Sequence, residues 1–167
     1  MIIIINGSLG VGKSASSWAL AEKFEKSVML DADYIGAIFP RDYKNSDWTE
    51  YLYKTIANLV EFHKKNNIEN FVINYVFETP KSLSALVNKL SAIDENIKIF
   101  YLSCNEEEQR QRIIKRNNSR LAWELERFLE LNEILRASAL SGSIGFDINT
   151  SKKTVAQVVE EIWQNRL

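Results

Sequence analysis

Residues 7–14 constrain this chain more than any other segment, because they read Gly-Ser-Leu-Gly-Val-Gly-Lys-Ser. This sequence matches the phosphate-binding loop (P-loop) pattern, in which a glycine is followed, after four free positions, by Gly-Lys and then Ser or Thr. The glycines let the loop bend around a phosphate, and the helix that follows points its positive end at the same anion. An apolar run precedes the loop and a helical pattern follows it, as the pattern requires. The segment therefore predicts a site for the phosphates of a nucleoside triphosphate.

Two side chains of the loop have predicted tasks. Lys13 is expected to reach the β- and γ-phosphates, and the Ser14 hydroxyl is expected to hold Mg²⁺. In the free loop we expect the Lys13 ammonium to face solvent, so that its removal leaves the fold intact. The residues predicted to contact the nucleotide in and just after the loop are Gly7, Leu9, Gly10, Val11, Gly12, Lys13, Ser14 and Ser16.

Short apolar runs alternate with longer amphipathic stretches, which is typical of strand-helix-strand units with a parallel sheet. The expected strands are residues 2–5, 27–30, 70–73, 97–102 and 145–148. The expected helices are residues 13–26, 48–65, 81–93, 106–115, 121–139 and 154–163. In the first of these helices, Trp18, Ala21 and Phe24 share the apolar face. The pattern predicts an α/β fold with three αβα layers, a five-stranded parallel sheet and a single domain over residues 1–167.

Composition argues against several kinds of partner. The formal net charge is -1 at pH 7, so no global positive field draws the protein to nucleic acid or to an anionic membrane. One cysteine, Cys104, and one histidine, His63, can form neither an internal disulfide nor a Cys/His metal site. The apolar start, residues 1–5, is too short for a signal peptide or a membrane span, and we expect a cytoplasmic protein. The sequence leaves the oligomeric state open.

Beyond the P-loop, four segments follow the order found in the P-loop kinases of small molecules. They are Leu-Asp-Ala-Asp at 30–33, Phe-Val-Ile-Asn at 71–74, Tyr-Leu at 101–102 with the arginines after it, and Phe-Asp-Ile-Asn-Thr-Ser at 146–151. Nearly the whole chain resembles this family, which includes shikimate, gluconate and chloramphenicol kinases and is related to nucleoside monophosphate kinases. The resemblance implies transfer of the γ-phosphoryl group of ATP to a hydroxyl of a small molecule, with Mg²⁺ as cofactor. It also implies a short lid around residues 112–127.

Asp31 and Asp33 come directly after the second expected strand. The carboxyl ends of parallel strands surround the ligand crevice, so both carboxylates should lie beside the P-loop. The resemblance of residues 33–40 to chloramphenicol phosphotransferases implies that Asp33 orients and deprotonates the acceptor hydroxyl. Some members of the resembled family place the metal-related carboxylate after the second strand, which implies that Asp31 lies near the metal. The alternative is that either residue caps a helix.

Arg112, Arg116 and Arg120 are spaced to share one helix face, where like charges repel by a few tenths of a kcal/mol per pair. An anion bound between them would remove this repulsion. The resemblance implies that one arginine lies against the adenine and that others contact the phosphates. Arg112 and Arg116 are therefore predicted to act in catalysis, and Arg112 also in nucleotide binding. The alternative is a surface helix with salt bridges such as that between Glu108 and Arg112.

Two further positions bear on the nucleotide and the metal. Thr150 lies in the polar turn that passes near the adenine in the resembled family, and it is predicted to bind the nucleotide; the alternative is an ordinary strand-to-helix turn. Asn74 stands where that family usually has the aspartate of the Walker B strand, and an amide carries no charge to hold Mg²⁺. This departure assigns the predicted metal-binding role to Asp31. It also keeps open a non-catalytic or degenerate nucleotide-binding protein.

The resemblance places the acceptor pocket after the second and third expected strands. The residues predicted to contact the acceptor substrate are Asp33, Tyr34, Phe39, Arg41, Tyr75 and Arg127. The aromatic residues among them could equally belong to the core. Arg127 could instead pair with Glu124 or Glu130 on the surface. A GTPase is not expected, because Asn-Lys-Leu-Ser at 88–91 lacks the aspartate of the guanine-binding motif, and the sequence leaves the identity of the acceptor open.

Overall fold

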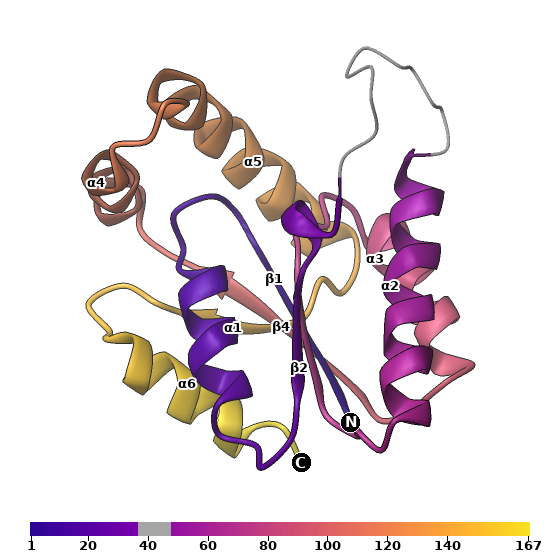
Figure 1. The fold of residues 1–167 in the computed structure, drawn as a ribbon. Coiled ribbons are helices and arrows are strands. Elements are labelled where there is room, and N and C mark those ends of the chain that lie inside the picture. The colour runs from indigo at the N-terminus through magenta and orange to yellow at the C-terminus, as the bar shows by residue number, and fades with distance from the viewer. Residues whose placement is uncertain (37–47) are drawn as a thin grey trace.

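Five parallel strands form one sheet in the computed structural model, which describes residues 1–36 and 48–167 (Figure 1). The strands are β1 (Ile2–Gly7), β2 (Val28–Asp31), β3 (Phe71–Asn74), β4 (Ile97–Ser103) and β5 (Phe146–Asn149). Their order in the sheet is β2-β3-β1-β4-β5, so β1 is central. Because all neighbours are parallel, the carboxyl ends of the strands gather along one edge of the sheet.

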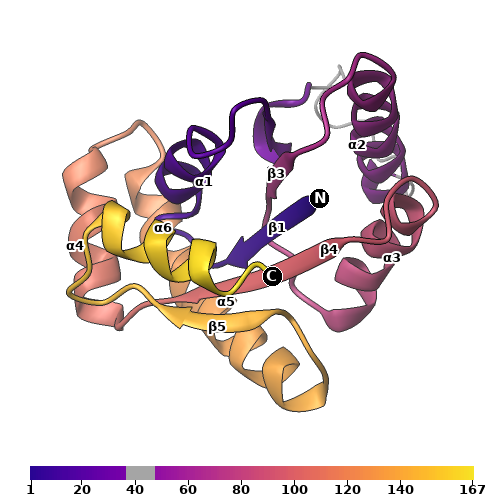
Figure 2. The same ribbon diagram turned by 90° about the horizontal axis from the view of Figure 1, so that it is seen from below.

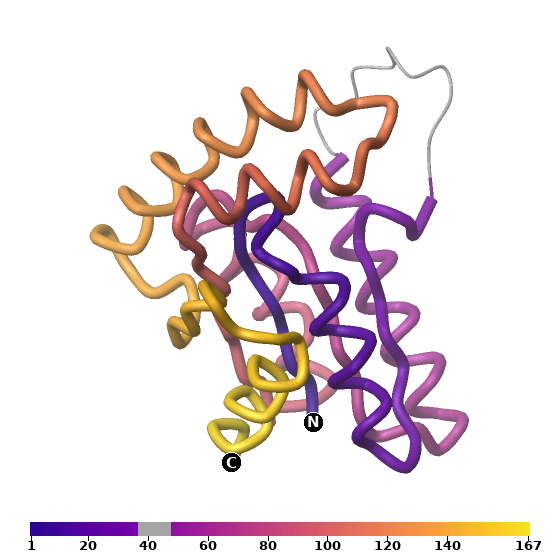
Figure 3. The backbone as a smooth tube through the Cα atoms, turned by 90° about the vertical axis from the view of Figure 1, so that its left-hand side faces the viewer, coloured from indigo at the N-terminus to yellow at the C-terminus, as the bar shows by residue number. Residues whose placement is uncertain are grey.

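Helices cover both faces of the sheet, which gives three layers (Figures 1 and 2). On one face lie α1 (Lys13–Ala21) and α6 (Val155–Gln164), and on the other lie α2 (Trp48–Lys65) and α3 (Pro80–Ser91). The hairpin of α4 (Glu106–Arg116) and α5 (Leu121–Ser141) passes over the loop between β1 and α1 (Figure 3). A short 3-10 helix, η1 (Ala32–Tyr34), follows β2. The predicted fold class is confirmed. None of the helices in the described ranges is both long and apolar enough to cross a lipid bilayer.

The side chains of β1 enter two separate cores. Ile2 and Ile4 pack with α2 and α3, whereas Ile3 and Ile5 pack with α1 and α6. All four are fully buried, and each such side chain contributes roughly 1.5–3 kcal/mol to folding. A strand buried on both faces is held rigidly, and it therefore fixes the position of the P-loop that follows it.

Helix α1 differs from its prediction in length and in the face that it buries. It ends at Ala21 and not at residue 26. Its buried residues include Ser16, Ser17 and Leu20. Of the predicted face, Ala21 is buried and Phe24, beyond the helix, packs against the same core, whereas Trp18 is 60% exposed. Small serines let a helix approach the sheet closely, and a search for apolar periodicity passes over them. All other elements agree with their predicted bounds to within two residues at each end.

Candidate functional site

A cavity of about 790 Å³ opens at the carboxyl edge of the sheet, and we refer to it as the P-loop cavity. The P-loop and the start of α1 form one wall, the acidic turn after β2 forms a second, and the segment after β3 forms a third. Residues of the α4–α5 hairpin line the remaining side. Twelve of the predicted site residues line it: Leu9, Gly10, Gly12, Lys13, Ser14, Asp31, Asp33, Tyr34, Tyr75, Arg112, Arg116 and Arg127. Two more, Phe39 and Arg41, lie outside the described residues.

Two glycines give the P-loop its shape. Gly12 has φ 100° and ψ 16°, a left-handed conformation that strains a residue with a Cβ atom. Gly10 has φ 76°, and a Cβ atom there would lie 2.9 Å from Cγ1 of Ile113 in α4. Gly12 is also the N-cap of α1 and has no side chain with which to bond the first N–H groups of the helix. These N–H groups and the positive helix end therefore face the cavity as a site for an anion.

The Lys13 ammonium does not face solvent as the sequence suggested. The residue is 9% exposed, and its Nζ donates a hydrogen bond to the Ser8 carbonyl oxygen at 2.8 Å. Burial lowers the pKa of Lys13 to about 8, against the opposing influence of Asp33 and Asp31. The loop thus holds a charged group inside itself, ready to exchange one carbonyl oxygen for phosphate oxygens.

Asp31 connects the acidic turn to the P-loop. One oxygen of its carboxylate accepts a hydrogen bond from Ser14 Oγ at 2.9 Å, and the other accepts one from the Asp33 N–H at 3.1 Å. The second bond makes Asp31 the N-cap of η1, so the capping alternative holds for this residue. The first bond brings together a hydroxyl and a carboxylate, which are oxygen ligands of the kind that Mg²⁺ takes in proteins.

Asp33 lies two residues further on, at the accessible mouth of the P-loop cavity. Partial loss of hydration and the neighbouring Asp31 carboxylate raise its pKa, while Lys13 acts in the opposite direction. Across the cavity, burial raises the pKa of Tyr75, and the charges of Asp33 and Glu78 raise it further. Tyr75, Asp33 and Glu78 all line the P-loop cavity. Tyr34 is 85% exposed beside them, so it is not a core residue.

Asn74 is 1% exposed, and its Nδ2 has no hydrogen-bond partner among the described residues. It is the register partner of Asp31 on the neighbouring strand. Both side chains point toward α1, because Val72 and Met29, two residues earlier on each strand, pack in the α1–α6 core. The carboxylate that is missing from the end of β3 thus has a counterpart one strand away, at the end of β2.

Arg112 joins three segments at the side of the P-loop cavity. Its guanidinium donates to Thr150 Oγ1 at 3.0 Å, to the Thr150 carbonyl at 2.9 Å and to the Val11 carbonyl at 3.3 Å. It also pairs with Glu108 at 2.5 Å. Thr150 is buried, and its hydroxyl donates to the Val11 carbonyl at 3.0 Å. This network ties the P-loop to α4 and to the turn after β5, and the predicted salt-bridge alternative also holds at Arg112.

The expected helical face of three arginines is only partly present. Helix α4 ends at Arg116 because Asn117 adopts a left-handed conformation, with φ 42°. Arg120 therefore precedes α5, yet it lines the same cavity and stacks on Trp123, with 4.3 Å between guanidinium and ring centroid. Arg116 pairs with the buried Glu124 at 3.2 Å. The hairpin still brings three cations to the mouth of the cavity, although not on one helix.

Arg127 bridges two carboxylates at the far end of the P-loop cavity. It pairs with Glu78 after β3 and, at 2.6 Å, with Glu130 on its own helix. Of the two partners proposed from the sequence, Glu130 is confirmed, whereas Glu124 pairs with Arg116 instead. The contact with Glu78 joins the hairpin to the sheet edge.

Sequence reasoning missed the polar pair that supports the P-loop from behind. Gln109 of α4 and Asn132 of α5 exchange hydrogen bonds, the shorter at 2.9 Å, and the Gln109 amide also donates to the Leu9 carbonyl. Both side chains are buried. Ser16 is buried below the loop, and its N–H donates to the Gly12 carbonyl at 3.0 Å. A polar residue at a helix position gives no sign in the sequence of such a partner 23 residues away.

Several solved structures share the fold of this chain at low sequence identity. None of the curated protein sequences is detectably similar to this chain. A sugar kinase from Janibacter sp. HTCC2649 superposes with a TM-score of 0.69 at 13% identity, over 98% of this chain and 92% of that one. A gluconokinase from Sinorhizobium meliloti 1021 gives 0.64 at 14%, over 98% and 90%. An uncharacterized protein from Eubacterium ventriosum ATCC 27560 gives 0.62 at 13%, over 98% and 96%.

A sequence model described as an AAA domain matches residues 2–136. The match runs from the first residue of β1 into α5, and it includes the P-loop, the acidic turn and the lid arginines. It covers far more than half of the 167 residues. With its P-loop and its five-stranded parallel sheet between helices, the chain belongs to this AAA domain family of P-loop proteins.

Proposed function

We propose that this protein is an ATP-dependent phosphotransferase that moves the γ-phosphoryl group of ATP to a hydroxyl of a small molecule. The observation that carries the proposal is the P-loop cavity, where a phosphate-binding loop, an acidic pair and several arginines face one another. Phosphoryl transfer depends almost entirely on such positioning and charge stabilisation. We further propose a single domain whose lid, around residues 112–127, consists of the facing ends of α4 and α5.

The proposed place of ATP follows from the P-loop. Its phosphates would lie against the backbone of residues 7–14, with Lys13 exchanging the Ser8 carbonyl for the β- and γ-phosphates. The adenine would lie near Arg112 and Thr150, whose mutual hydrogen bonds join α4 to the turn after β5. Arg116 would then approach the transferring group from the lid.

The Ser14 and Asp31 side chains fit Mg²⁺, because a hydroxyl and a carboxylate 2.9 Å apart face the cavity beside the loop. Magnesium in such sites is commonly held by one or two carboxylates together with phosphate oxygens. When bound, the ion would neutralise charge on the β- and γ-phosphates. Asp31 would supply the negative charge that Asn74 lacks.

Asp33 is proposed as the group that orients and deprotonates the acceptor. The acceptor oxygen forms a bond to the γ-phosphorus while the bond from that phosphorus to the bridging oxygen of ADP breaks. The hydroxyl proton passes to the Asp33 carboxylate. A raised pKa suits this task, since it makes the carboxylate a better proton acceptor near neutral pH.

The acceptor is proposed to lie between the acidic turn and the segment after β3, where Tyr34, Tyr75 and Arg127 line the cavity. Phe39 and Arg41 belong to the same proposal and lie outside the described residues. The titles of two proteins with this fold, a sugar kinase and a gluconokinase, support sugars and sugar acids as the first acceptors to test.

Asn74 favours one alternative, a nucleotide-binding protein without transferase activity, because an uncharged residue stands at the end of β3. A screen for ATP consumption separates the two. Wild-type protein is incubated with Mg²⁺-ATP and panels of sugars, sugar acids, nucleosides, nucleotides and antibiotics, and products are identified by mass spectrometry. We expect ADP and a phosphorylated acceptor in equal amounts, and neither in Lys13→Ala. Tight ATP binding without acceptor-dependent turnover for any compound would instead support the alternative.

A further inference from the structure

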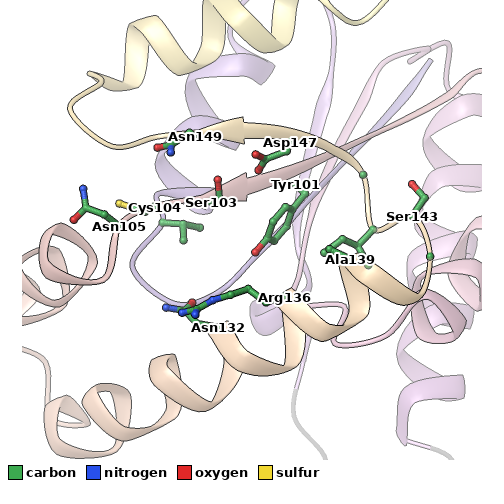
Figure 4. Close-up of a pocket in the computed structure, with 14 residues that line it drawn as sticks. Tyr101, Ser103, Cys104, Asn105, Asn132, Arg136, Ala139, Ser143, Asp147 and Asn149 are labelled. Atoms are coloured by element: carbon green, nitrogen blue, oxygen red, sulfur yellow. The ribbon is translucent and has the colours of Figure 1, made fainter.

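A second cavity of about 500 Å³ lies between α5 and the edge of the sheet formed by β4 and β5 (Figure 4). Its volume falls within the roughly 300–1,000 Å³ that is usual for small-molecule sites. Among the described residues, none lines both this cavity and the P-loop cavity. The β5 side is open to solvent, because Asp147 and Asn149 on that edge strand are exposed. Among the described residues assigned to the proposed transferase activity, only Val11 of the P-loop lines this space.

The floor of the cavity is polar where the same face of the sheet is otherwise apolar. On β4, Ile97 and Ile99 pack against the core, but Tyr101 and Ser103, the next residues on that face, line the cavity. Their register partners on β5 are Asp147 and Asn149, which line it as well. Four polar side chains thus form a block at the carboxyl ends of two neighbouring strands.

The roof of the cavity is polar too. Asn132, Arg136 and Ala139, at i, i+4 and i+7 of α5, face the sheet across the cavity (Figure 4). The large apolar residues of the helix are buried elsewhere: Phe128, Leu131 and Leu135. A helix normally covers a sheet with its apolar stripe. Here two polar residues and an alanine face the polar block, with the cavity between them.

Several of these groups have unused hydrogen-bonding capacity. Within the described part of the chain, no side-chain hydrogen bond or ion pair involves the Asp147 carboxylate or the Tyr101 hydroxyl. Arg136 pairs with Glu106 through one nitrogen of a guanidinium that has five N–H donors. Burial raises the pKa of Tyr101, and the Asp147 charge raises it further against the influence of Arg136. Asp147 is the register partner of Tyr101, and Arg136 lines the same cavity.

We propose that this cavity binds a free α-amino acid, with the ammonium group of the ligand on Asp147 and its carboxylate on Arg136 and the Tyr101 hydroxyl. The lining has one carboxylate and one guanidinium, which together match a zwitterion. A phosphorylated ligand would meet repulsion from Asp147, and a neutral sugar would leave the Asp147 carboxylate without a cationic partner. Val11, Ala139 and Ile144 provide an apolar surface for the ligand side chain.

Cys104 provides a direct probe, since it is the single cysteine of the chain and it lines the cavity. The rate at which a thiol reagent modifies Cys104 is measured with each of the common L-amino acids at millimolar concentration, and binding is confirmed by calorimetry. We expect at least one amino acid to slow the modification and to bind. If none binds or protects the thiol, the proposal is wrong.

Two variants, each with a matched control, test whether Asp147 and Arg136 contact the bound amino acid. Asp147→Asn and Arg136→Gln each remove one charge from the cavity and should weaken binding of that amino acid about tenfold or more. Glu133→Gln, an exposed α5 residue, and Lys26→Gln, an exposed residue after α1, remove the same charges elsewhere and should change nothing. Circular dichroism and binding of an ATP analogue should be unaltered in all four variants. Equal affinity of the amino acid for wild type and both cavity variants would overturn the assignment.

Discussion

At the scale of single residues, the buried ammonium of Lys13 has the most direct consequence for function. Replacing it by alanine removes a charge whose hydrogen bond, among residues 1–36 and 48–167, is to the Ser8 carbonyl. The replacement should weaken ATP binding about 10- to 100-fold, the loss expected for charge-assisted bonds to phosphate. The free energy of unfolding should change by less than about 1 kcal/mol, because removing a buried charge also removes its desolvation penalty. Titration with a fluorescent ATP analogue and urea unfolding measure the two effects. Unchanged ATP affinity in the folded variant would contradict the P-loop assignment, and Lys26→Ala is the exposed control.

The lowered pKa of Lys13 makes ATP binding dependent on pH in a defined direction. With a pKa of about 8, the free protein is protonated at Lys13 below that pH and loses the charge above it. The apparent affinity for ATP should therefore fall about tenfold between pH 7 and pH 9, as the protonated fraction of one group with this pKa does. The dissociation constant is measured across that range with Mg²⁺-ATP in excess metal. A constant value up to pH 9 would show that the ammonium is not limiting.

Asp33 is the proposed base of the transfer step. Asp33→Asn should preserve ATP binding and stability but lower the rate of phosphoryl transfer about 10²-fold, within the range for a positioned acid or base. The base must be ionised and its pKa is raised, so kcat of the wild type should decrease as the pH is lowered below neutrality. The variant should not show this decrease. The variant keeps the backbone N–H of residue 33, which donates a hydrogen bond to the Asp31 carboxylate. A lower melting temperature with full transfer activity would mean that Asp33 is structural, and Glu78 would be the next candidate.

At the scale of elements, the α4–α5 hairpin separates two kinds of arginine. Arg116 is exposed and, within the described part of the chain, its one ion pair is with Glu124. Arg116→Ala should lower kcat about 10²-fold, the loss typical of one donor to a developing charge, with little change in stability. Arg112 also holds the Val11 and Thr150 carbonyls, so Arg112→Ala should lower both kcat and the melting temperature. Stopped-flow transfer rates at saturating ATP and thermal unfolding test both. Lys115→Ala, exposed on the same helix, is the control, and full activity in both arginine variants would exclude a role for the lid in catalysis.

The same elements show where sequence patterns suffice and where they fail. The long amphipathic helices and the buried strands were predictable because their apolar spacing follows from the core that they share, as in β1 and α2. The buried face of helix α1 was not predictable from apolar spacing, because it includes Ser16 and Ser17 while Trp18 faces solvent.

For the molecule as a whole, the sequence predicts which residues meet at the candidate site. It does not predict the hydrogen bonds and ion pairs that they form there. The P-loop motif and the rule that parallel strands end at one edge bring Lys13, Ser14 and Asp31 together. The ion pair of Arg127 with Glu78 spans 49 residues and depends on the angle of the hairpin, which no local pattern encodes. The second cavity likewise appears only when α5 is placed over β4 and β5, because each of its polar residues alone resembles an ordinary exposed position.

The opposite, amino edge of the sheet offers a way to test stability apart from function. There Asp94, after α3, accepts hydrogen bonds from Lys64 at the end of α2 at 2.9 Å, from the Asn96 N–H at 2.9 Å and from the Met1 ammonium at 3.1 Å. Burial by itself would raise the pKa of Asp94, but these donors outweigh it and hold the pKa at about 2. The carboxylate thus links the start of β1 and the end of α2 to the turn before β4.

The sign of the pH effect follows from that lowered pKa. The stabilisation by Asp94 is complete above about pH 4, near the pKa of an unfolded aspartate, and is lost as the pH falls toward 2. Asp94→Asn should therefore lower the free energy of unfolding by about 2 kcal/mol at pH 7, and the difference from wild type should shrink between pH 4 and pH 2.5. Urea unfolding at several pH values measures it, with the exposed neighbour Glu95→Gln as control. Since Asp94 lies at the edge remote from the P-loop, ATP affinity should be the same in wild type and variant. A difference in stability that stays constant down to pH 2.5 would show that packing, and not charge, is what Asp94 contributes.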